Sequence, residues 1–417
     1  MSFMNVGSNS YHVAVVGGGP AGLCAAVALA QGGAQTALIA RRAPYADNRT
    51  TALLGTSVDF LKELDVWRNC EDKVAELKTM RLVDDTGRLI RAPEVRFHSD
   101  EIGLEAFGYN IENRELVAGL EARAAELPNL ERIDDEADAV VSEDRKVLIH
   151  TRGGHTVSTL LVVGADGRHS LCREAAGIGI IRRDLKQAAL TFNVHLSRPH
   201  QNISTEFHTA LGPCVFVPLQ GKRCSVVWVA SPKEAERLRA LSDDELSEAA
   251  EKQSRSIFGR VQVEPGRHLF SLSIETPGSF AQKRVALVGE AAHVIPPIGA
   301  QGLNLGLRDA ADIAELVTRE IASGGDPGTA QALFRYDMAR RADVLSRTFV
   351  IDMANRSLLS DFLPVQSMRA AGLHLIGSIA PLRRLAMREG LSPSWRALQP
   401  RLGATPGSRN GQATRDV

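Results

Sequence analysis

The chain has 417 residues, 44% hydrophobic and 24% charged, which is enough for two packed domains of ordinary globular composition. Its 49 basic residues balance 49 acidic ones, so nucleic acid is excluded as an expected partner. The five cysteines include no C-x-x-C pair and leave an odd one over, which favours reduced thiols in a cytoplasmic protein over a disulfide or metal framework.

The N-terminal region has a pattern that is typical of a βαβ unit. The residues before it lack the basic and apolar regions of a signal peptide, and no apolar run in the chain nears the roughly 20 residues of a membrane span. The apolar run His12–Val16 predicts a strand, and an alanine-rich helix follows a glycine-rich turn and continues to about Gln31. A second strand is expected over Gln35–Ala40.

The middle of the chain predicts further elements of both kinds. These are a hairpin over residues 78–96 with its turn at Asp84–Gly87, a helix Arg114–Leu127, a buried strand Thr159–Val163, and strands Ala188–Leu196, Val215–Leu219, Cys224–Ala230 and Arg267–Glu275 with one charged helix Lys233–Ser254 among them. A buried strand Arg284–Val288, a glycine-rich loop and a helix from about Gly302 come next.

This order of elements predicts an α/β protein with a Rossmann-like domain, an inserted antiparallel-sheet domain and a helical C-terminal region. The expected boundaries are residues 1–77, 110–180 and 281–345 for the Rossmann-like domain, 78–109 and 181–280 for the insert, 346–400 for the helical region, and 401–417 for a disordered tail.

The glycine-rich turn after the first strand has the spacing G-x-G-x-x-G, at Gly17, Gly19 and Gly22. The first glycine permits a tight turn, the second lets a pyrophosphate approach the backbone, and the third lets the helix pack closely. Pro20 and Ala21 complete the start of the helix, whose positive end faces the phosphates. The turn therefore predicts a dinucleotide site.

The acid that normally ends the second strand of such a site and holds the adenosine ribose is missing. Ala40 stands in its place, and Arg41 and Arg42 follow. We interpret Arg41 as a cofactor residue at the ribose or phosphates. Two alternatives stay open: a solvated strand end, and a 2′-phosphate site of an NADP-binding dehydrogenase.

Two later segments argue against the dehydrogenase. Gly164–Ser170 (GADGRHS) closes one predicted strand, and Glu290–Asp309 (EAAHVIPPIGAQGLNLGLRD) follows another. With the GxGxxG turn, they resemble the three signatures of the single-component FAD-dependent aromatic hydroxylases: GxGxxG, a "DG" motif and a "GD" motif. The resemblance spans roughly residues 11–391 and is strongest to the UbiH/UbiF-type hydroxylases of ubiquinone biosynthesis. Beyond the GD segment it is carried by Arg49–Leu53, Leu64–Trp67 and Phe362–Leu391.

The resemblance implies which residues bind FAD. In the GD segment, Glu290 would accept hydrogen bonds from ribityl or ribose hydroxyls, although the family has Asp there. The loop and the helix that follows would approach the flavin ring and its N1/O2 edge with backbone N–H groups. The residues of this loop and helix are Gly299, Gln301, Gly302, Leu303 and Asn304.

Three further residues gain a cofactor role by resemblance, each with a structural alternative. Asp166 of the DG motif would assist FAD and nicotinamide binding, with Arg168 near phosphate, or else cap a turn. Arg49 would lie near the cofactor, or else be a surface charge. Asn113 would border the flavin where a helix begins, or else cap that helix.

No catalytic side chain is assigned by the sequence, because the chemistry belongs largely to the flavin. The loop with Pro296, Pro297 and Gly299 is expected to face the substrate pocket. His293 is a candidate base, but it has no acidic neighbour in sequence, and a hydrogen-bonded structural histidine is the more frequent case. No histidine spacing indicates a metal site.

The resemblance implies ring hydroxylation through a flavin C4a-hydroperoxide, with O2 as co-substrate and NAD(P)H or a separate reductase as electron donor. The implied substrate is a lipophilic aromatic ring, a polyprenylated phenol or quinol precursor of ubiquinone. The alternatives are a soluble hydroxylase of small phenolic acids and a non-catalytic flavin-fold member of a biosynthetic complex.

The C-terminal region is basic and amphipathic. From Phe362 to Val417 it has eight arginines, no lysine and two acids. Val365, Met368, Gly372, Leu375 and Ile379 recur at helical spacing, and Pro381 should break that helix or open a second. We expect docking on the inner face of the cytoplasmic membrane or on a ubiquinone-biosynthesis complex, or a terminal hairpin packed on the rest of the protein with its arginines in water.

Overall fold

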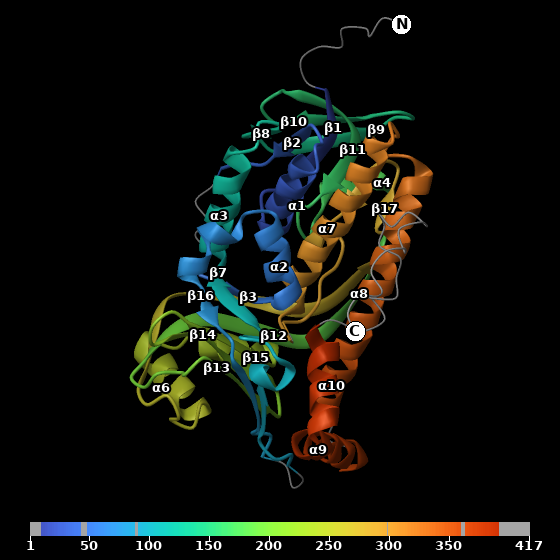
Figure 1. Cartoon of the computed structure of the whole chain (residues 1–417). Coiled ribbons are helices and arrows are strands. Elements are labelled where there is room, and N and C mark those ends of the chain that lie inside the picture. The colour runs from blue at the N-terminus through green and yellow to red at the C-terminus, as the bar shows by residue number, and fades with distance from the viewer. Residues whose placement is uncertain (1–9, 43–47, 88–90, 298, 360–362, 392–417) are drawn as a thin grey trace, which may run out of the picture.

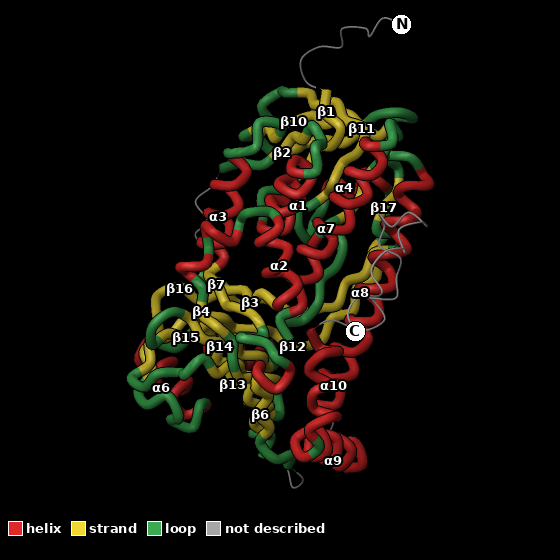
Figure 2. The backbone as a smooth tube through the Cα atoms, viewed as in Figure 1, coloured by secondary structure: helices red, strands yellow, loops and turns green. Residues whose placement is uncertain are grey.

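The computed structural model describes residues 10–42, 48–87, 91–297, 299–359 and 363–391. A largely parallel sheet with helices lies at one end of the molecule and a second, twisted sheet at the other, and long strands and helices connect them (Figures 1 and 2). The predicted α/β class, with a Rossmann-like part, a strand-rich insert and a helical C-terminal part, is confirmed.

The first sheet has the order β17-β18-β11-β1-β2-β8, and the antiparallel pair β9–β10 joins at β11. Its strands are β1 (Ser10–Val16), β2 (Thr36–Ile39), β8 (Leu130–Ile133), β9 (Ala137–Ser142), β10 (Val147–Thr151), β11 (Thr156–Gly164), β17 (Ala281–Gln282) and β18 (Val285–Leu287). Strands β18, β11, β1, β2 and β8 are parallel. The residues of β18, β11, β1 and β2 are mostly buried, as expected for a sheet covered on both faces, whereas the edge strand β8 is only partly buried.

Helices α1 (Pro20–Gln31), α3 (Asn113–Ala125) and α7 (Gln301–Ala322) run beside the parallel sheet, and α2 (Gly55–Glu63) and α4 (Leu171–Ala176) are shorter (Figure 1). Proline at the first position of α1 fixes the helical φ where an N–H is not needed, and alanines continue it. Residues Gly22–Ala30 of α1 are buried, because the helix is packed between the sheet, α3 and α7.

The second sheet has the order β16-β12-β15-β14-β13-β5-β6. Its strands are β5 (Thr79–Asp84), β6 (Val95–His98), β12 (Ile180–Leu196), β13 (Ile203–Thr209), β14 (Gly212–Leu219), β15 (Arg223–Ala230) and β16 (Val261–Pro277). All neighbours are antiparallel except β13 and β5, which pair in parallel. The predicted hairpin over residues 78–96 is confirmed by the β5–β6 pair. Strand β13 was not predicted from the sequence.

The predicted single helix Lys233–Ser254 is wrong. The chain forms two helices, α5 (Pro232–Arg239) and α6 (Asp243–Gln253). Ser242 begins α6 by accepting a hydrogen bond from the backbone N–H of Glu245, whose side chain in turn accepts from the backbone N–H of Ser242. This capping box is a strong start signal, so it interrupts a stretch that has helical composition throughout.

A small sheet, β3-β7-β4, lies between the two large ones. It consists of β3 (Thr50–Leu54), β4 (Ala75–Glu76) and β7 (Gly108–Glu112), with the short 3-10 turns η1 (Trp67–Asn69), η2 (Glu71–Lys73) and η3 (Ser99–Ile102) nearby in the chain. The side-chain amide of Asn110 on β7 donates to the carbonyl of Pro218 on β14 (2.8 Å), so this sheet is joined to the larger one.

The C-terminal helices are α8 (Ala330–Leu359), α9 (Leu363–Ser378) and α10 (Ala380–Leu391). Helix α8 extends from the parallel sheet to the second sheet, and α9 and α10 lie at its far end (Figure 1). Pro381 is the second residue of α10, so the predicted helix break is confirmed. Among the described residues no helix is long and apolar enough to cross a bilayer. The predicted tail 401–417 lies outside the described residues.

Candidate functional site

The three sequence motifs follow the carboxyl ends of three adjacent parallel strands. Val16 of β1 is in register with Gly164 of β11, and Gly164 is in register with Leu287 of β18. The GxGxxG turn, the DG motif and the GD motif therefore leave the sheet side by side. In open α/β sheets this edge is where ligands bind.

The turn glycines have the geometry that the fingerprint requires. Gly17 has φ +115°, and a Cβ there would lie 2.2 Å from the carbonyl oxygen of Ala165 in the DG motif. A Cβ at Gly22 would lie 2.1 Å from the carbonyl oxygen of Gly17. Only glycine fits at either position, so the first and third glycines serve turn and packing as predicted.

Gly19 differs from its two partners, since a Cβ there would meet no described atom within 4 Å. It stands at the N-cap of α1, which has no side-chain cap and no acid in its first turn. The first backbone N–H groups of α1, from Ala21 onward, therefore point from an open helix end that carries partial positive charge. An anionic pyrophosphate fits this place.

The DG motif is used to shape the turn into α4. The Ser170 hydroxyl donates to Oδ1 of Asp166 (2.5 Å), and the backbone N–H of Cys172 donates to Oδ2 (3.0 Å). These bonds support the turn-capping alternative for Asp166, and its cofactor role stays a prediction. Arg168 forms an ion pair with the buried carboxylate of Glu275 on β16. Its side chain is therefore directed at the second sheet rather than at the GxGxxG turn.

The GD segment meets α1 directly. A Cβ at Gly289 would lie 3.1 Å from the Cβ of Ala21, and one at Gly306 on α7 would lie 3.2 Å from the same atom. Glu290, in the 3-10 turn η4 (Gly289–Ala291), is exposed and has no partner among the described residues. Its carboxylate is therefore available to a ligand beside the start of α1.

The start of α7 resembles the start of α1. Ala300 is its N-cap with φ +54°, the helix has no side-chain cap or first-turn acid, and a Cβ at Gly302 would meet no described atom within 4 Å. Gly299 has φ +65°, and Leu303 is half-buried. The loop and helix end thus present backbone N–H groups to open space, which fits the electron-rich edge of a flavin.

Two predicted cofactor residues of α7 have structural bonds instead of free side chains. The Asn304 amide donates to the carbonyl of Ala52 (2.8 Å) and accepts from the backbone N–H of Leu54 (3.0 Å), so it ties α7 to β3. The Gln301 amide accepts a hydrogen bond from Arg347 on α8 (2.8 Å). Both residues position the N-terminus of α7, and direct contact of their side chains with FAD stays a prediction.

His293 has the acidic partner that its sequence neighbours do not supply. Its Nε2 lies 2.7 Å from Oδ2 of Asp309, which also accepts a 2.9 Å hydrogen bond from the backbone N–H of Gly289. Both side chains are buried. Burial by itself would raise the pKa of the Asp309 carboxyl, but the attraction of His293 and Arg340 outweighs it and lowers that pKa. This supports the structural interpretation of His293.

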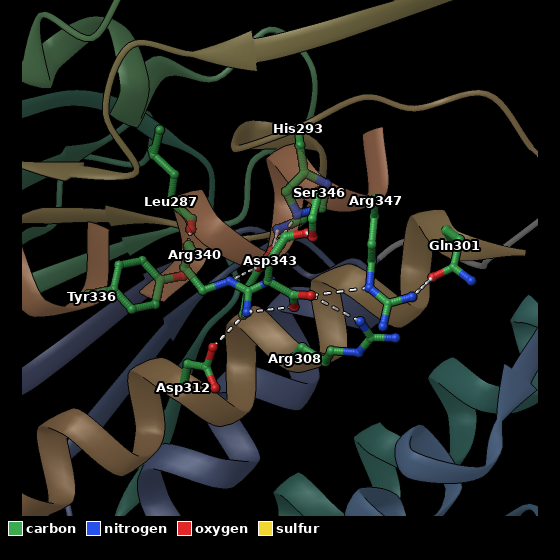
Figure 3. A network of polar contacts seen from close by, with 12 residues as sticks. Leu287, His293, Gln301, Arg308, Asp312, Tyr336, Arg340, Asp343, Ser346 and Arg347 are labelled. Carbon is green, nitrogen blue, oxygen red and sulfur yellow. Dashed lines mark hydrogen bonds and ion pairs between the residues drawn. The ribbon is translucent and has the colours of Figure 1, made fainter. Parts of the chain in front are cut away.

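Asp309 belongs to a buried network of charges that joins α7 to α8. Figure 3 shows the network around Arg340 and Asp343. Arg340 donates to Asp309 (2.7 Å) and to Asp312 (2.6 Å), and it forms an ion pair with Asp343 (3.1 Å). Asp343 in turn accepts from Arg347 (3.1 Å), the arginine that holds Gln301. The network fixes the GD loop at both ends, and the sequence reading assigned no role to its α8 members.

Arg49 and Asn113 lie where β3 meets α3. The backbone N–H of Asn113 donates to the carbonyl of Arg49 (2.9 Å), and its side-chain oxygen accepts from the Thr51 hydroxyl (2.6 Å). Arg49 lines an open pocket of about 360 Å³ together with Arg239, Arg267, His268, Leu269 and Phe270. This pocket is too basic to suit a lipophilic ring.

Arg41 and the predicted pocket loop complete the set. Arg41 is exposed and pairs with Glu136 (3.0 Å), which supports the strand-end alternative. Pro296 is buried and Pro297 half-buried in the loop after η4. Just before them, Val294 and Glu275 exchange backbone hydrogen bonds (2.9 and 3.1 Å), so β16 reaches this loop.

Comparison with known proteins decides the family. Residues 10–343 match the family model described as FAD binding domain. The chain belongs to this family. It is 30% identical over 386 residues to the ubiquinone hydroxylase UbiL of Rhodospirillum rubrum, covering 91% of this chain and 89% of that protein. It is 29% identical to 3-demethoxyubiquinol 3-hydroxylase of Escherichia coli, covering 91% and 98%. Within the family it is an FAD-dependent aromatic-ring monooxygenase of the UbiH type.

Solved structures show the same fold. The p-nitrophenol 4-monooxygenase PnpA of Pseudomonas putida superposes with a TM-score of 0.77 at 19% identity, covering 92% of this chain and 99% of that one. The flavin-dependent monooxygenase PieE in complex with FAD and substrate gives 0.67 at 20% identity, covering 92% and 72%.

Proposed function

We propose that this family member hydroxylates the aromatic ring of a polyprenylated phenol or quinol intermediate of ubiquinone biosynthesis. The observation that carries the proposal is the likeness to two ubiquinone-pathway hydroxylases over about nine-tenths of the chain. The proposal is also supported by the position of the three motifs at one edge of the sheet, because motifs that leave adjacent strands can form one extended dinucleotide site.

The residues at this edge fit FAD in an extended pose. The open N-terminus of α1 at Gly19 would hold the pyrophosphate, and the carboxylate of Glu290 would accept hydrogen bonds from ribityl hydroxyls. The N-terminus of α7 at Gly302 would face the N1/O2 edge of the ring. Bound FAD would supply the activation of O2 for ring hydroxylation.

The protein itself contributes position and shelter. Arg347 holds Gln301, and Asp309 holds the backbone of Gly289, so the loop that faces the flavin is fixed from behind. The bond pair between Val294 and Glu275 closes the second sheet against the same loop. We therefore propose that Pro296, Pro297 and Gly299 form one wall of the substrate pocket and that residues 78–109 and 181–280 supply the other. A sheltered pocket is required to keep water from the reactive oxygen species.

The proposal places the protein in the cytoplasm, on the inner face of the cytoplasmic membrane. Exposed apolar side chains occur on α9 and α10, at Met368, Leu375, Leu382 and Leu385, and Arg384 and Arg388 on α10 are exposed beside them. A basic, partly apolar surface suits an anionic bilayer, and a polyprenylated substrate is collected from one. Arg383 has a different role, because it pairs with Glu101 (2.6 Å).

Purified protein tests the assignment. We expect it to retain FAD and to convert a polyprenylated phenol to a product one oxygen heavier, with NADH, NADPH or an added reductase as electron donor. Conversion of small phenolic acids alone would favour the soluble hydroxylase, and flavin-free protein would favour a non-catalytic role in a complex. A deletion strain should accumulate the substrate, identified by mass spectrometry, which names the ring position.

A further inference from the structure

The end of β2 lacks the carboxylate that normally binds the adenosine ribose, since Ala40 ends in a methyl group. Arg132 on β8 occupies this corner. One of its terminal nitrogens lies 3.3 Å from the carbonyl oxygen of Ala40 and 3.2 Å from that of Arg41. The same nitrogen lies 3.8 Å from where a Cβ would stand on Gly18, within the GxGxxG turn. A guanidinium group therefore borders the place of the ribose.

A carboxylate is attached to this guanidinium. The other terminal nitrogen of Arg132 forms an ion pair with Oε1 of Glu121 on α3, while Oε2 of Glu121 has no partner among the described residues. The Glu121 side chain is about one-third exposed and that of Arg132 nine-tenths buried. The Arg132 guanidinium thus lies between Glu121 on one side and Gly18 and Ala40 on the other, and Glu121 keeps one acceptor oxygen that is not bonded to it.

Two other carboxylates at this edge are directed elsewhere. Asp134 accepts from the backbone N–H of Arg42 (2.6 Å), and Glu136 pairs with Arg41 (3.0 Å) and Arg152 (3.1 Å). Among the described residues of this corner, Glu121 is the acid whose partner Arg132 bonds the carbonyl of Ala40 and also lies near Gly18 of the GxGxxG turn.

A purely structural role leaves one feature of the pair unexplained. Nε of Arg132 is buried and has no hydrogen-bond partner. The terminal nitrogens of the group donate to Glu121 and to the carbonyls of Ala40 and Arg41, but the unsatisfied buried donor at Nε opposes folding. A requirement to present Glu121 at the cofactor edge would account for it.

We propose that Glu121, held in place by Arg132, replaces the missing acid and accepts a hydrogen bond from a ribose hydroxyl on the adenosine half of FAD. The inference rests on FAD binding by this family member. It makes Glu121 a cofactor-binding residue and Arg132 a positioning residue. A salt-bridged carboxylate on a helix thereby takes over a task that the fold usually gives to the end of β2.

The test is the dissociation constant of FAD from the apoprotein, followed by flavin fluorescence, for the wild type and Glu121→Gln. Loss of a charge-assisted hydrogen bond should weaken FAD binding about 10-fold or more. FAD analogues whose adenosine ribose lacks one or both hydroxyls should show a much smaller difference between the two proteins. Glu136→Gln, at the same sheet edge, is the matched control and should bind FAD like the wild type.

Two further variants separate binding from folding. Ala40→Glu in the Glu121→Gln background restores an acid at the end of β2 and should recover FAD affinity. Arg132→Lys keeps a cation beside Glu121 and should lower affinity for FAD more than for the deoxyribose analogues. Unchanged FAD affinity in Glu121→Gln, or an equal loss for FAD and the analogues, overturns the inference. Wild-type apoprotein that fails to bind FAD at all would instead count against the proposed function.

Discussion

Nε of Arg340 donates a 2.7 Å hydrogen bond to Oδ1 of Asp309, and both side chains are completely buried. The pair joins α8 to the GD segment of α7. Arg340→Met should cost about 3–5 kcal/mol of unfolding free energy, because it removes the cation that pairs with the buried carboxylates of Asp309 and Asp343. Arg335→Met, on the same helix, breaks the partly exposed pair with Glu320 and should cost under about 1 kcal/mol. Urea unfolding compares the two, and equal midpoints would contradict this prediction.

The same carboxylate predicts a pH dependence. The pKa of Asp309 is lowered in the folded protein, because the attraction of His293 and Arg340 outweighs its burial. A lowered folded pKa contributes stability that is fully present above the unfolded value of about 4 and is lost as the pH falls through the folded value. The difference in unfolding free energy between the wild type and Asp309→Asn should therefore stay constant from neutral pH to about pH 4 and shrink below it. A difference that grows on acidification would contradict the assignment.

The charged network around Asp309 shows which contacts can be predicted from the sequence and which cannot. The strand-turn-helix elements around each motif could be predicted, since local spacing of glycines and apolar residues determines them. Arg340 and Arg347 could not, because their partners Asp309 and Gln301 lie 31 and 46 residues away. Helical periodicity alone does not distinguish a buried arginine from a solvated one.

Gly19 provides a direct test of the GxGxxG turn. Gly19→Val should fold, since a Cβ there meets no described atom within 4 Å, but its branched side chain would occupy the space of the pyrophosphate. The purified variant should be colourless. Gly179→Val is the matched control, because that glycine also has open space and lies outside the motifs. Flavin absorbance per mole of protein is the measurement, and a full flavin load in Gly19→Val would refute the reading.

Side-chain bonds also explain why the cofactor roles of single residues were harder to predict than the site. The edge of the sheet follows from strand order, but Asn304 and Asp166 use their polar groups to hold β3 and α4. The sequence alone does not show whether a polar residue in a motif bonds a ligand or the backbone.

The second sheet sets a condition for exchanging the proposed substrate region. Strand β5 pairs in parallel with β13, from Ile203↔Thr79 to His208↔Asp84. A chimera that replaces residues 181–280 alone would mismatch this pairing, so residues 78–109 must be exchanged with them. Taken from a hydroxylase of small phenolic acids, the two segments together should change which ring stimulates oxygen uptake. The single-segment chimera is the control and should unfold at a lower temperature. An unchanged ring preference in a flavin-loaded double exchange would count against the proposed pocket.

The proposed membrane surface can be tested on α10. Arg384 and Arg388 are exposed and lie four residues apart, so they share one helix face. Each arginine near an anionic bilayer contributes about 1 kcal/mol, so Arg384→Gln with Arg388→Gln should reduce flotation with anionic liposomes about tenfold or more at low salt. Arg383 is left unchanged, because its pair with Glu101 holds α10 to η3 and its loss would mix destabilisation with docking.

The matched control removes two exposed arginines from other faces, as Arg152→Gln with Arg237→Gln, whose side chains pair with Glu136 and Glu234. It has the same net charge as the α10 variant, so a uniform charge effect would lower the flotation of both proteins equally. Docking by α10 predicts that the α10 variant alone loses binding, and that high salt weakens wild-type binding because it screens the arginines.

Leu382→Ser with Leu385→Ser tests the apolar contribution, which salt does not screen. Wild-type protein that fails to float at either salt concentration would contradict docking on a bilayer. A dimer whose formation requires the same leucines would assign this surface to a second copy of the chain.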